Sequence, residues 1–237
     1  MRQLLLIGWV IAVAASLPLP AQSAPIRVLV YHFDVDAHGF GSSRSIANGG
    51  VMDYGTSSVT YGGTGTLTVN VLAATQDGGL VVDVIEHMDR VDRPFQTVRC
   101  AIYENPDQVI CDQNLAKAGY VTEELQMLLT YLGRGFYNSS RLDAKNHWQT
   151  KEDLNGGTGS IVCDYTVTKT DGDVLTISVN RDHHDGPYQK NTSGTLQYDP
   201  KMTDFSKAHF VSDVADSGAT GGSTVSFDLI SDSFASH

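Results

Sequence analysis

The chain is poor in cysteine, tryptophan and positive charge, and beyond its N-terminus it lacks any long apolar run. It has three cysteines and two tryptophans, and its 16 basic residues against 27 acidic ones leave a net charge of −11. An acidic chain of this kind is a poor partner for nucleic acid or for an anionic membrane surface. A membrane-spanning helix needs about 20 apolar residues, so no stable membrane insertion is expected after signal cleavage.

The short sequence motifs typical of common catalytic and nucleotide-binding sites are also absent. There is no Gly-x-Ser-x-Gly, no phosphate-binding glycine loop that ends in lysine, no dinucleotide fingerprint and no His-Glu-x-x-His. Catalytic groups can still be assembled from distant positions, so the question of an enzyme stays open. The sequence favours a non-catalytic protein and predicts no cofactor.

The N-terminus has the pattern of a signal peptide. Arg2 precedes an apolar core at Leu4–Leu17, and the small residues Ala21 and Ser23 occupy the positions that a signal peptidase reads. We therefore expect residues 1–23 to be removed and 24–237 to form a single β-rich domain. The expected location is the periplasm or the extracellular medium.

The chain is organised around a hairpin pattern between Gly62 and Ile85. Two β-rich runs flank an Asp-Gly turn there, and the pattern returns 94 positions later without a gap. We interpret this as an internal repeat, with 62–120 and 156–213 as its two copies. In each copy one strand face is apolar, formed by Leu67, Val69, Val71 and Ala73 and by their counterparts Ile161, Cys163, Tyr165 and Val167.

Other strands are predicted at 26–33, 95–103, 108–111 and 223–230, and one helix is predicted just after Thr122. Thr122 is a suitable N-cap, a leucine stripe defines one face, and Gly133 ends the helix. Two long polar stretches, 39–58 and 134–155, read as loops.

These elements predict a mainly β fold of the α+β kind. We expect a curved antiparallel sheet or half-barrel of about ten strands, built from two similar hairpin units, with one packed helix. In outline this arrangement resembles the half-barrel carriers of bacterial lipids. No motif of those carriers matches positions in this chain, so the sequence assigns no family.

Two of the cysteines are placed to form a disulfide. Pairing Tyr103 with Gln108 across the turn sets Cys100 directly opposite Cys111, at a separation that a disulfide can bridge. Cys163 then remains as a buried free thiol on an apolar strand face.

The helix and the polar stretch that follows it supply candidate ligand contacts. Helix leucines must pack on something, and a sheet with a packed helix can enclose an apolar ligand between the two. The candidate residues are Leu125, Leu128, Leu129, Phe136 and Trp148. Core packing of the same residues is the alternative.

A candidate metal site follows the first mature strand. His32, Asp34, Asp36 and His38 alternate, so a continuing strand would present all four on one face, and imidazole and carboxylate groups suit zinc or similar metals. A hydrated strand end explains the pattern equally well. A second histidine cluster, 182–187, reads first as a turn.

The leading interpretation is an exported, soluble protein of the cell envelope that binds an apolar or lipid-like molecule between sheet and helix. The alternatives are a metal-dependent or hydrolytic exported enzyme, and a structural or adhesive β module. The sequence names no protein partner.

Overall fold

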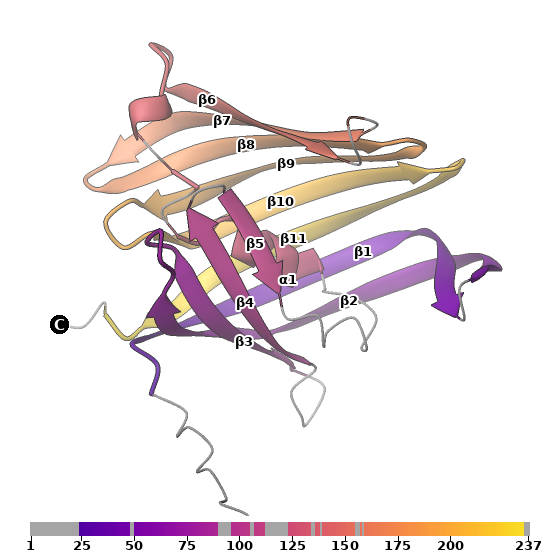
Figure 1. The fold of residues 1–237 in the computed structure, drawn as a ribbon, viewed down its shortest axis with the longest axis horizontal. Helices are drawn as coiled ribbons and strands as arrows, with labels where there is room; N and C mark the ends of the chain where they lie inside the picture. The colour runs from indigo at the N-terminus through magenta and orange to yellow at the C-terminus, as the bar shows by residue number, and fades with distance from the viewer. Residues whose placement is uncertain are drawn as a thin grey trace, which may run out of the picture.

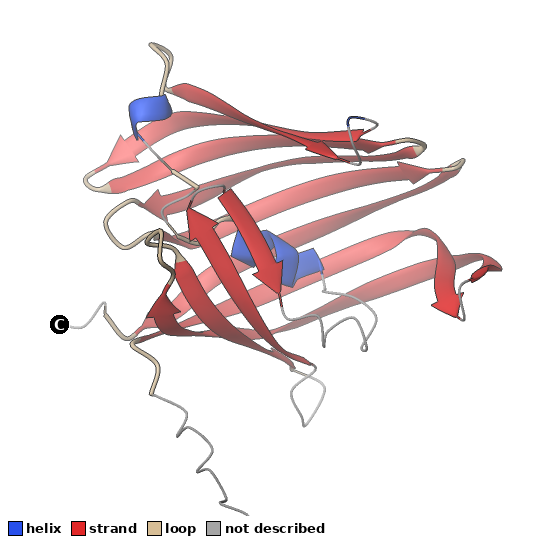
Figure 2. Cartoon of the chain, viewed as in Figure 1, coloured by secondary structure: helices blue, strands red, loops and turns tan. Residues whose placement is uncertain are grey.

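The computed structural model describes residues 24–47, 50–89, 96–104, 107–111, 123–133, 136–137, 139–154, 157 and 159–234. The predicted signal segment, Thr122 and Asn105–Pro106 lie outside these residues. The described chain forms mostly antiparallel β-structure with one α-helix, α1 (Glu123–Thr130), and a 3-10 helix at Ser139–Arg141 (Figure 2). The predicted fold class is confirmed.

The strands form one eleven-stranded sheet in the order β5-β4-β3-β2-β1-β11-β10-β9-β8-β7-β6. Every described pair of neighbours is antiparallel. The bounds are β1 Arg27–Ala47, β2 Gly50–Ala74, β3 Leu80–Met88, β4 Gln96–Glu104, β5 Asp107–Cys111, β6 His147–Leu154, β7 Gly159–Asp171, β8 Val174–Asp185, β9 Tyr188–Asp199, β10 Asp204–Asp216 and β11 Ala219–Asp232.

The chain enters the sheet at its centre and leaves it there. From β1 it moves outward to the edge strand β5, crosses through α1 to the other edge at β6, and returns inward to β11, which pairs with β1. Figure 1 shows that β3, β4 and β5 curl over one face of the long strands, and that α1 lies inside the curl. The sheet is therefore concave on the side that holds the helix.

The alternation expected for the two hairpin copies is present over most of their length. Leu67, Val69 and Val71 are buried on β2, as are Cys163 and Tyr165 on β7. The expectation for Ala73 was wrong. A β-bulge between Val71 and Ala73 shifts the register, and Ala73 is exposed.

The two hairpins have this bulge in common. β7 carries a register shift between Val167 and Lys169, close to its turn, as β2 does between Val71 and Ala73. The internal repeat itself, over 62–120 and 156–213, stays a prediction.

The two stretches interpreted as loops contain strands. Within 39–58, β1 continues to Ala47 and pairs with β2 alone after Gly39, so the two strands form a ribbon that extends beyond β11. The ribbon was not predicted because its sequence is rich in glycine and serine and therefore shows no hydrophobic alternation. Within 134–155, residues 147–154 form the edge strand β6, whose alternation is masked by Lys, Glu and Asp.

The β4–β5 hairpin has the predicted register. Cys100 lies opposite Cys111, and Tyr103 lies opposite Gln108. The disulfide is formed between Cys100 and Cys111, with Cα atoms 4.0 Å apart. Cys163 is a buried free cysteine, as expected.

Candidate functional site

The five predicted ligand contacts meet in one place, on the concave face of the sheet. Leu125, Leu128 and Leu129 come from α1, Phe136 follows the helix, and Trp148 comes from the edge strand β6. All five belong to one buried hydrophobic cluster and are 0–3% exposed. The structure thus brings them together as the interior between sheet and helix. Their role in ligand binding stays a prediction.

An aromatic cluster occupies the part of this interior nearest β6. Trp148 stacks on Tyr165 with ring centroids 4.7 Å apart. Phe136 stands edge-on to Trp148, Tyr165, Tyr198 and Tyr131, with centroids 5.9, 5.3, 5.1 and 5.2 Å away. Edge-to-face and offset contacts of this kind add to the stability that burial alone provides.

Trp148 has a polar atom that this cluster does not satisfy. Its indole Nε1 is fully buried and has no hydrogen-bond partner in the described part of the chain. An indole N–H is only a donor, and burying it without an acceptor costs free energy. The interior therefore holds an available donor within an aromatic surface.

Two hydrogen bonds hold the turn that follows α1 against the sheet. The Gly133 amide donates to the Thr203 carbonyl at 2.9 Å, and the Tyr198 hydroxyl donates to the Gly133 carbonyl at 2.7 Å. Tyr131 stacks on Phe210 at 4.9 Å. Gly133 has φ of 87°, a left-handed conformation that suits the predicted helix stop.

Burial shapes the titration of the tyrosines in this interior. Burial raises the pKa of Tyr131, and the positive charge of Arg181 opposes that increase. Burial also raises the pKa of Tyr165, with the neighbouring Tyr131 acting in the same direction. Both phenols are therefore neutral at physiological pH. Two carboxylates, Glu86 and Glu124, are also buried in the molecule.

Polar side chains lie on the concave face near the β8–β9 and β10–β11 turns. They come from the C-terminal parts of β8 and β10 and from the N-terminal part of β9. Arg181 lies opposite Cys163 on one side and Thr192 on the other, and it is half-buried. The hydroxyls of Thr192 and Ser212 are hydrogen-bonded at 2.9 Å, and both residues are buried. Sequence reasoning missed Arg181, because nothing in its local sequence shows which face of β8 points inward.

Beyond Arg181 comes His183, which lies opposite Lys190 and contacts the ring of Tyr188 at 4.9 Å. Partial burial lowers the pKa of His183, and the charge of Arg181 lowers it further, while Asp185 acts in the opposite direction. His184 is the next strand residue and points to the opposite face. The predicted turn in 182–187 is formed at Gly186, with φ of 61°.

A buried network of ion pairs lies at the opposite end of β10 and β11, away from the turn that joins them. Arg27 donates to Asp232 from Nε at 3.0 Å and from Nη2 at 2.7 Å, to the Met202 carbonyl at 2.6 Å, and to Asp204. Burial would lower the pKa of Arg27, but the hydrogen bond to Asp232 and the two carboxylate charges raise it instead. The pKa of nearby Tyr31 is raised by burial and by the Asp204 charge. This network joins β1, β10 and β11.

The four predicted metal ligands all lie on the outer face of β1, opposite to the core. His32 is half-buried, whereas Asp34, Asp36 and His38 are exposed. Alternate residues on a strand are about 6.6–6.8 Å apart along its axis, so neighbouring side chains diverge toward solvent. No group of three His, Cys, Asp or Glu side chains suitable for a metal ion occurs among the described residues. The metal site stays a prediction without a grouped ligand set.

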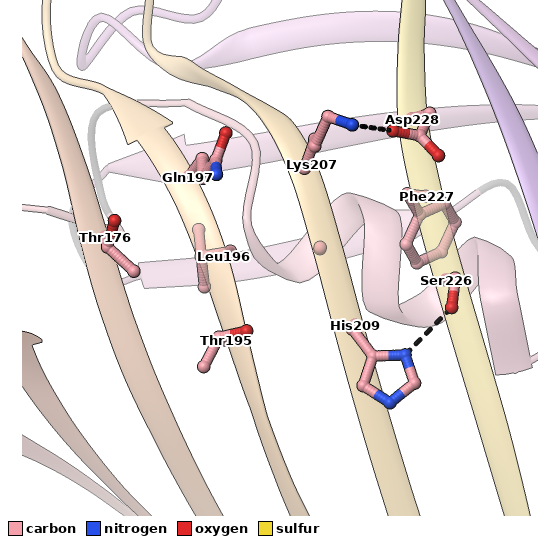
Figure 3. Close-up of a pocket in the computed structure, with 10 residues that line it drawn as sticks. Thr176, Thr195, Leu196, Gln197, Lys207, His209, Ser226, Phe227 and Asp228 are labelled. Carbon is pink, nitrogen blue, oxygen red and sulfur yellow. Dashed lines mark hydrogen bonds and ion pairs between the residues drawn. The ribbon is translucent and has the colours of Figure 1, made fainter.

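Next to these residues, the outer face carries an open groove of about 340 Å³. Figure 3 shows its side chains on β8 to β11, with the helix on the far side of the strands. The His209 Nδ1 and the Ser226 hydroxyl are 2.9 Å apart, and Lys207 pairs with Asp228 at 3.0 Å. The register sets Asp34 of β1 opposite Ser226. The groove is lined by Thr176, Thr195, Leu196, Gln197, Lys207, Ala208, His209, Ser226, Phe227 and Asp228.

None of the helices in the described residues is both long enough and apolar enough to cross a membrane.

Comparisons with known proteins assign no family to this chain. No protein-family model matches the chain, and no curated protein matches it. Among solved structures, one similar chain belongs to lipovitellin and comes from a study of lipid–protein interactions in that protein. The likeness has a TM-score of 0.42 and 10% sequence identity, and it covers 90% of this chain. This chain spans 26% of the length of that lipovitellin chain.

Proposed function

We propose that this is an exported, non-catalytic protein that binds an apolar, lipid-like molecule between the concave face of its sheet and α1. The aromatic cluster around Trp148 carries the proposal. It combines several buried aromatic side chains with a buried indole donor that lacks an acceptor within the described chain. An ester, amide or acid carbonyl on a mainly apolar ligand would supply that acceptor.

Displacement of α1 would give the ligand access to the interior between sheet and helix. α1 has eight residues, too few to be stable alone in water, so its position depends on the side chains it buries. Displacing it breaks no strand pairing, because the sheet runs continuously from β5 to β6 without it. A short helix outside the strand ladder opens at lower free energy than the strands of a sheet. An acyl chain that replaces the leucines of α1 would restore the lost apolar contacts.

Export is supported by two independent features. The first 23 residues have the basic start, apolar core and small-residue cleavage pattern of a signal peptide. The structure also contains a disulfide, a bond typical of oxidising compartments outside the cytosol.

Trp148 provides the test. Of the two tryptophans, Trp9 lies in the expected signal segment, so a chain that begins at Ala24 carries Trp148 alone. A brominated acyl chain quenches tryptophan fluorescence on close contact. We expect a brominated fatty acid to quench Trp148 saturably at one equivalent per chain, and a non-brominated fatty acid to reverse the quenching.

The matched control is His209→Ala on the outer groove, which should quench as the wild type does. Saturable binding without quenching of Trp148 would place the ligand elsewhere. A folded chain that binds no acyl probe would overturn the proposal. Mass spectrometry of protein purified without detergent should in addition show a bound mass of a few hundred daltons.

A further inference from the structure

Along the strands, the residues on the concave face change from apolar to polar. One row of neighbouring positions across the sheet is apolar, and it includes Trp148, Tyr165, Val179 and Phe210. The next row on the same face, two residues further along each strand, is polar from β8 onward. It consists of Cys163, Arg181, Thr192, Ser212 and Ser223. Two strand residues span about 6.6–6.8 Å, so the polar row begins about 7 Å from the aromatic row.

Arg181 is the charged group in that polar row. It lies between Cys163 and Thr192, and its charge acts on the buried hydroxyl of Tyr131. Figure 1 shows β8 to β11 extending well past α1 toward the β8–β9 and β10–β11 turns. The register therefore places Arg181 at the boundary between the apolar and polar rows of the concave face, on the side of the β8–β9 turn.

The groups beyond Arg181 carry charges of both signs. His183 faces Lys190, with Asp185 and Glu152 nearby. The depressed pKa of His183 keeps its imidazole neutral at pH 7, so Lys190 is balanced there by the two carboxylates. Arg181 is one row closer to the aromatic cluster than any of these groups. It is the cation that a bound amphiphile would meet first.

We infer that the ligand carries an acidic head group, received by Arg181 and the adjoining Thr192 and Ser212 hydroxyls while the apolar part lies against Trp148. This inference rests on the proposed function and names its ligand class, a singly or doubly charged anionic amphiphile. A guanidinium binds carboxylate and phosphate through two parallel N–H···O bonds, which a neutral alcohol cannot accept.

The test compares probes that share one acyl chain and differ in the head group. Brominated oleic acid and the matching brominated oleyl alcohol are titrated at pH 8 against the chain that begins at Ala24, with Trp148 quenching as the readout. A charge-assisted bond at a half-buried site corresponds to a preference for the acid of about 10- to 100-fold.

The variants are Arg181→Gln and Arg181→Lys, with Arg99→Gln on the outer face as the control. Arg181→Gln should reduce the preference for the acid to about onefold and leave the affinity for the alcohol unchanged. Arg181→Lys should keep part of the preference, because the charge remains but the two parallel N–H groups are lost. Arg99→Gln should behave as the wild type does.

The outcomes separate the two proposals. Equal wild-type affinities for acid and alcohol, together with equal affinities for a charged and an uncharged phospholipid, would overturn the acidic head group and leave apolar binding intact. If neither probe quenches Trp148 in the folded protein, the proposed function itself fails. The wild-type ratio decides the question even if Arg181→Gln does not fold.

A further arm distinguishes the sources of the charge. Brominated phosphatidic acid is compared with brominated phosphatidylcholine, which carries no net charge. Preference for phosphatidic acid together with weak binding of oleic acid identifies a lipid phosphate, whereas the reverse identifies a free fatty acid. Equal binding of the two phospholipids, with no preference for oleic acid over its alcohol, would overturn the inference.

Discussion

Arg27 is a cation buried between two carboxylates, so its removal would take away the positive charge that both of them contact. Its side chain is 9% exposed, and those of Asp204 and Asp232 are 5% and 2% exposed. Removing one partner of a buried ion pair costs about 3–5 kcal/mol. We expect Arg27→Met to lower the free energy of unfolding by that amount, measured by urea denaturation.

The matched control is Arg99→Met. Arg99 also pairs with an aspartate, Asp83, at 2.6 Å, but its side chain is 52% exposed. An exposed pair contributes at most about 1 kcal/mol. Equal losses for the two variants would show that the Arg27 network has no special role in stability.

At this scale the sequence predicts contacts that depend on local pairing and misses those that depend on distant strands. Cys100 and Cys111 flank one short turn, so simple counting sets them opposite each other, as the structure confirms. Arg27 is separated from Asp204 and from Asp232 by more than 170 residues of chain. Arg181 was missed for the same reason, since its environment depends on which face of an eleven-stranded sheet is concave.

In the proposed function, ligand entry depends on displacement of α1, and the thiol of Cys163 can report that displacement. With Cys100 and Cys111 paired, Cys163 is the free thiol, and it is buried in the same interior. Leu128 is fully buried on α1, and its truncation costs about 2–5 kcal/mol of packing. We expect Leu128→Ala to make Cys163 react with a thiol reagent at least 10-fold faster than in the wild type.

The control is Ile110→Ala, on β5, whose side chain is 50% exposed and contributes little to the interior. Its thiol should react at the wild-type rate. If Leu128→Ala leaves the rate unchanged although the protein is folded and less stable, access to the interior does not run through α1.

At the scale of helices and strands, hydrophobic periodicity predicted the elements correctly, whereas residue composition did not. The β2–β3 and β7–β8 hairpins and the leucine face of α1 were visible because apolar residues recur with the right period. The ribbon of β1 and β2 and the edge strand β6 were missed, because Gly, Ser and charged side chains are common where a strand has few neighbours to pack against.

The whole sheet depends on its last strand. β11 pairs with β1 on one side and β10 on the other, so it joins the two halves of the sheet. A chain of residues 24–216 would expose both of those edges and lose Asp232, the partner of Arg27. Open strand edges favour aggregation. We expect this shortened chain to be insoluble or to unfold without a cooperative transition.

A chain of residues 24–234 is the control and should unfold cooperatively. A synthetic peptide of residues 217–234 should restore solubility to the shortened chain if β11 acts by completing the sheet. A soluble, cooperative 24–216 monomer would show that either half of the sheet is stable by itself.

The pairing of β1 with β11 also brings the first and last strands of the chain together at the centre of the sheet. The Ser233 amide donates to the Val28 carbonyl at 2.9 Å, so the two described ends of the chain lie side by side. A short linker between them would create a closed circuit: outward from β1 to β5, across through α1, and inward from β6 to β11. Opening that circuit at the Gly172 turn would give a circular permutant with every strand pairing of the native sheet, and with β1 and β11 as an ordinary hairpin.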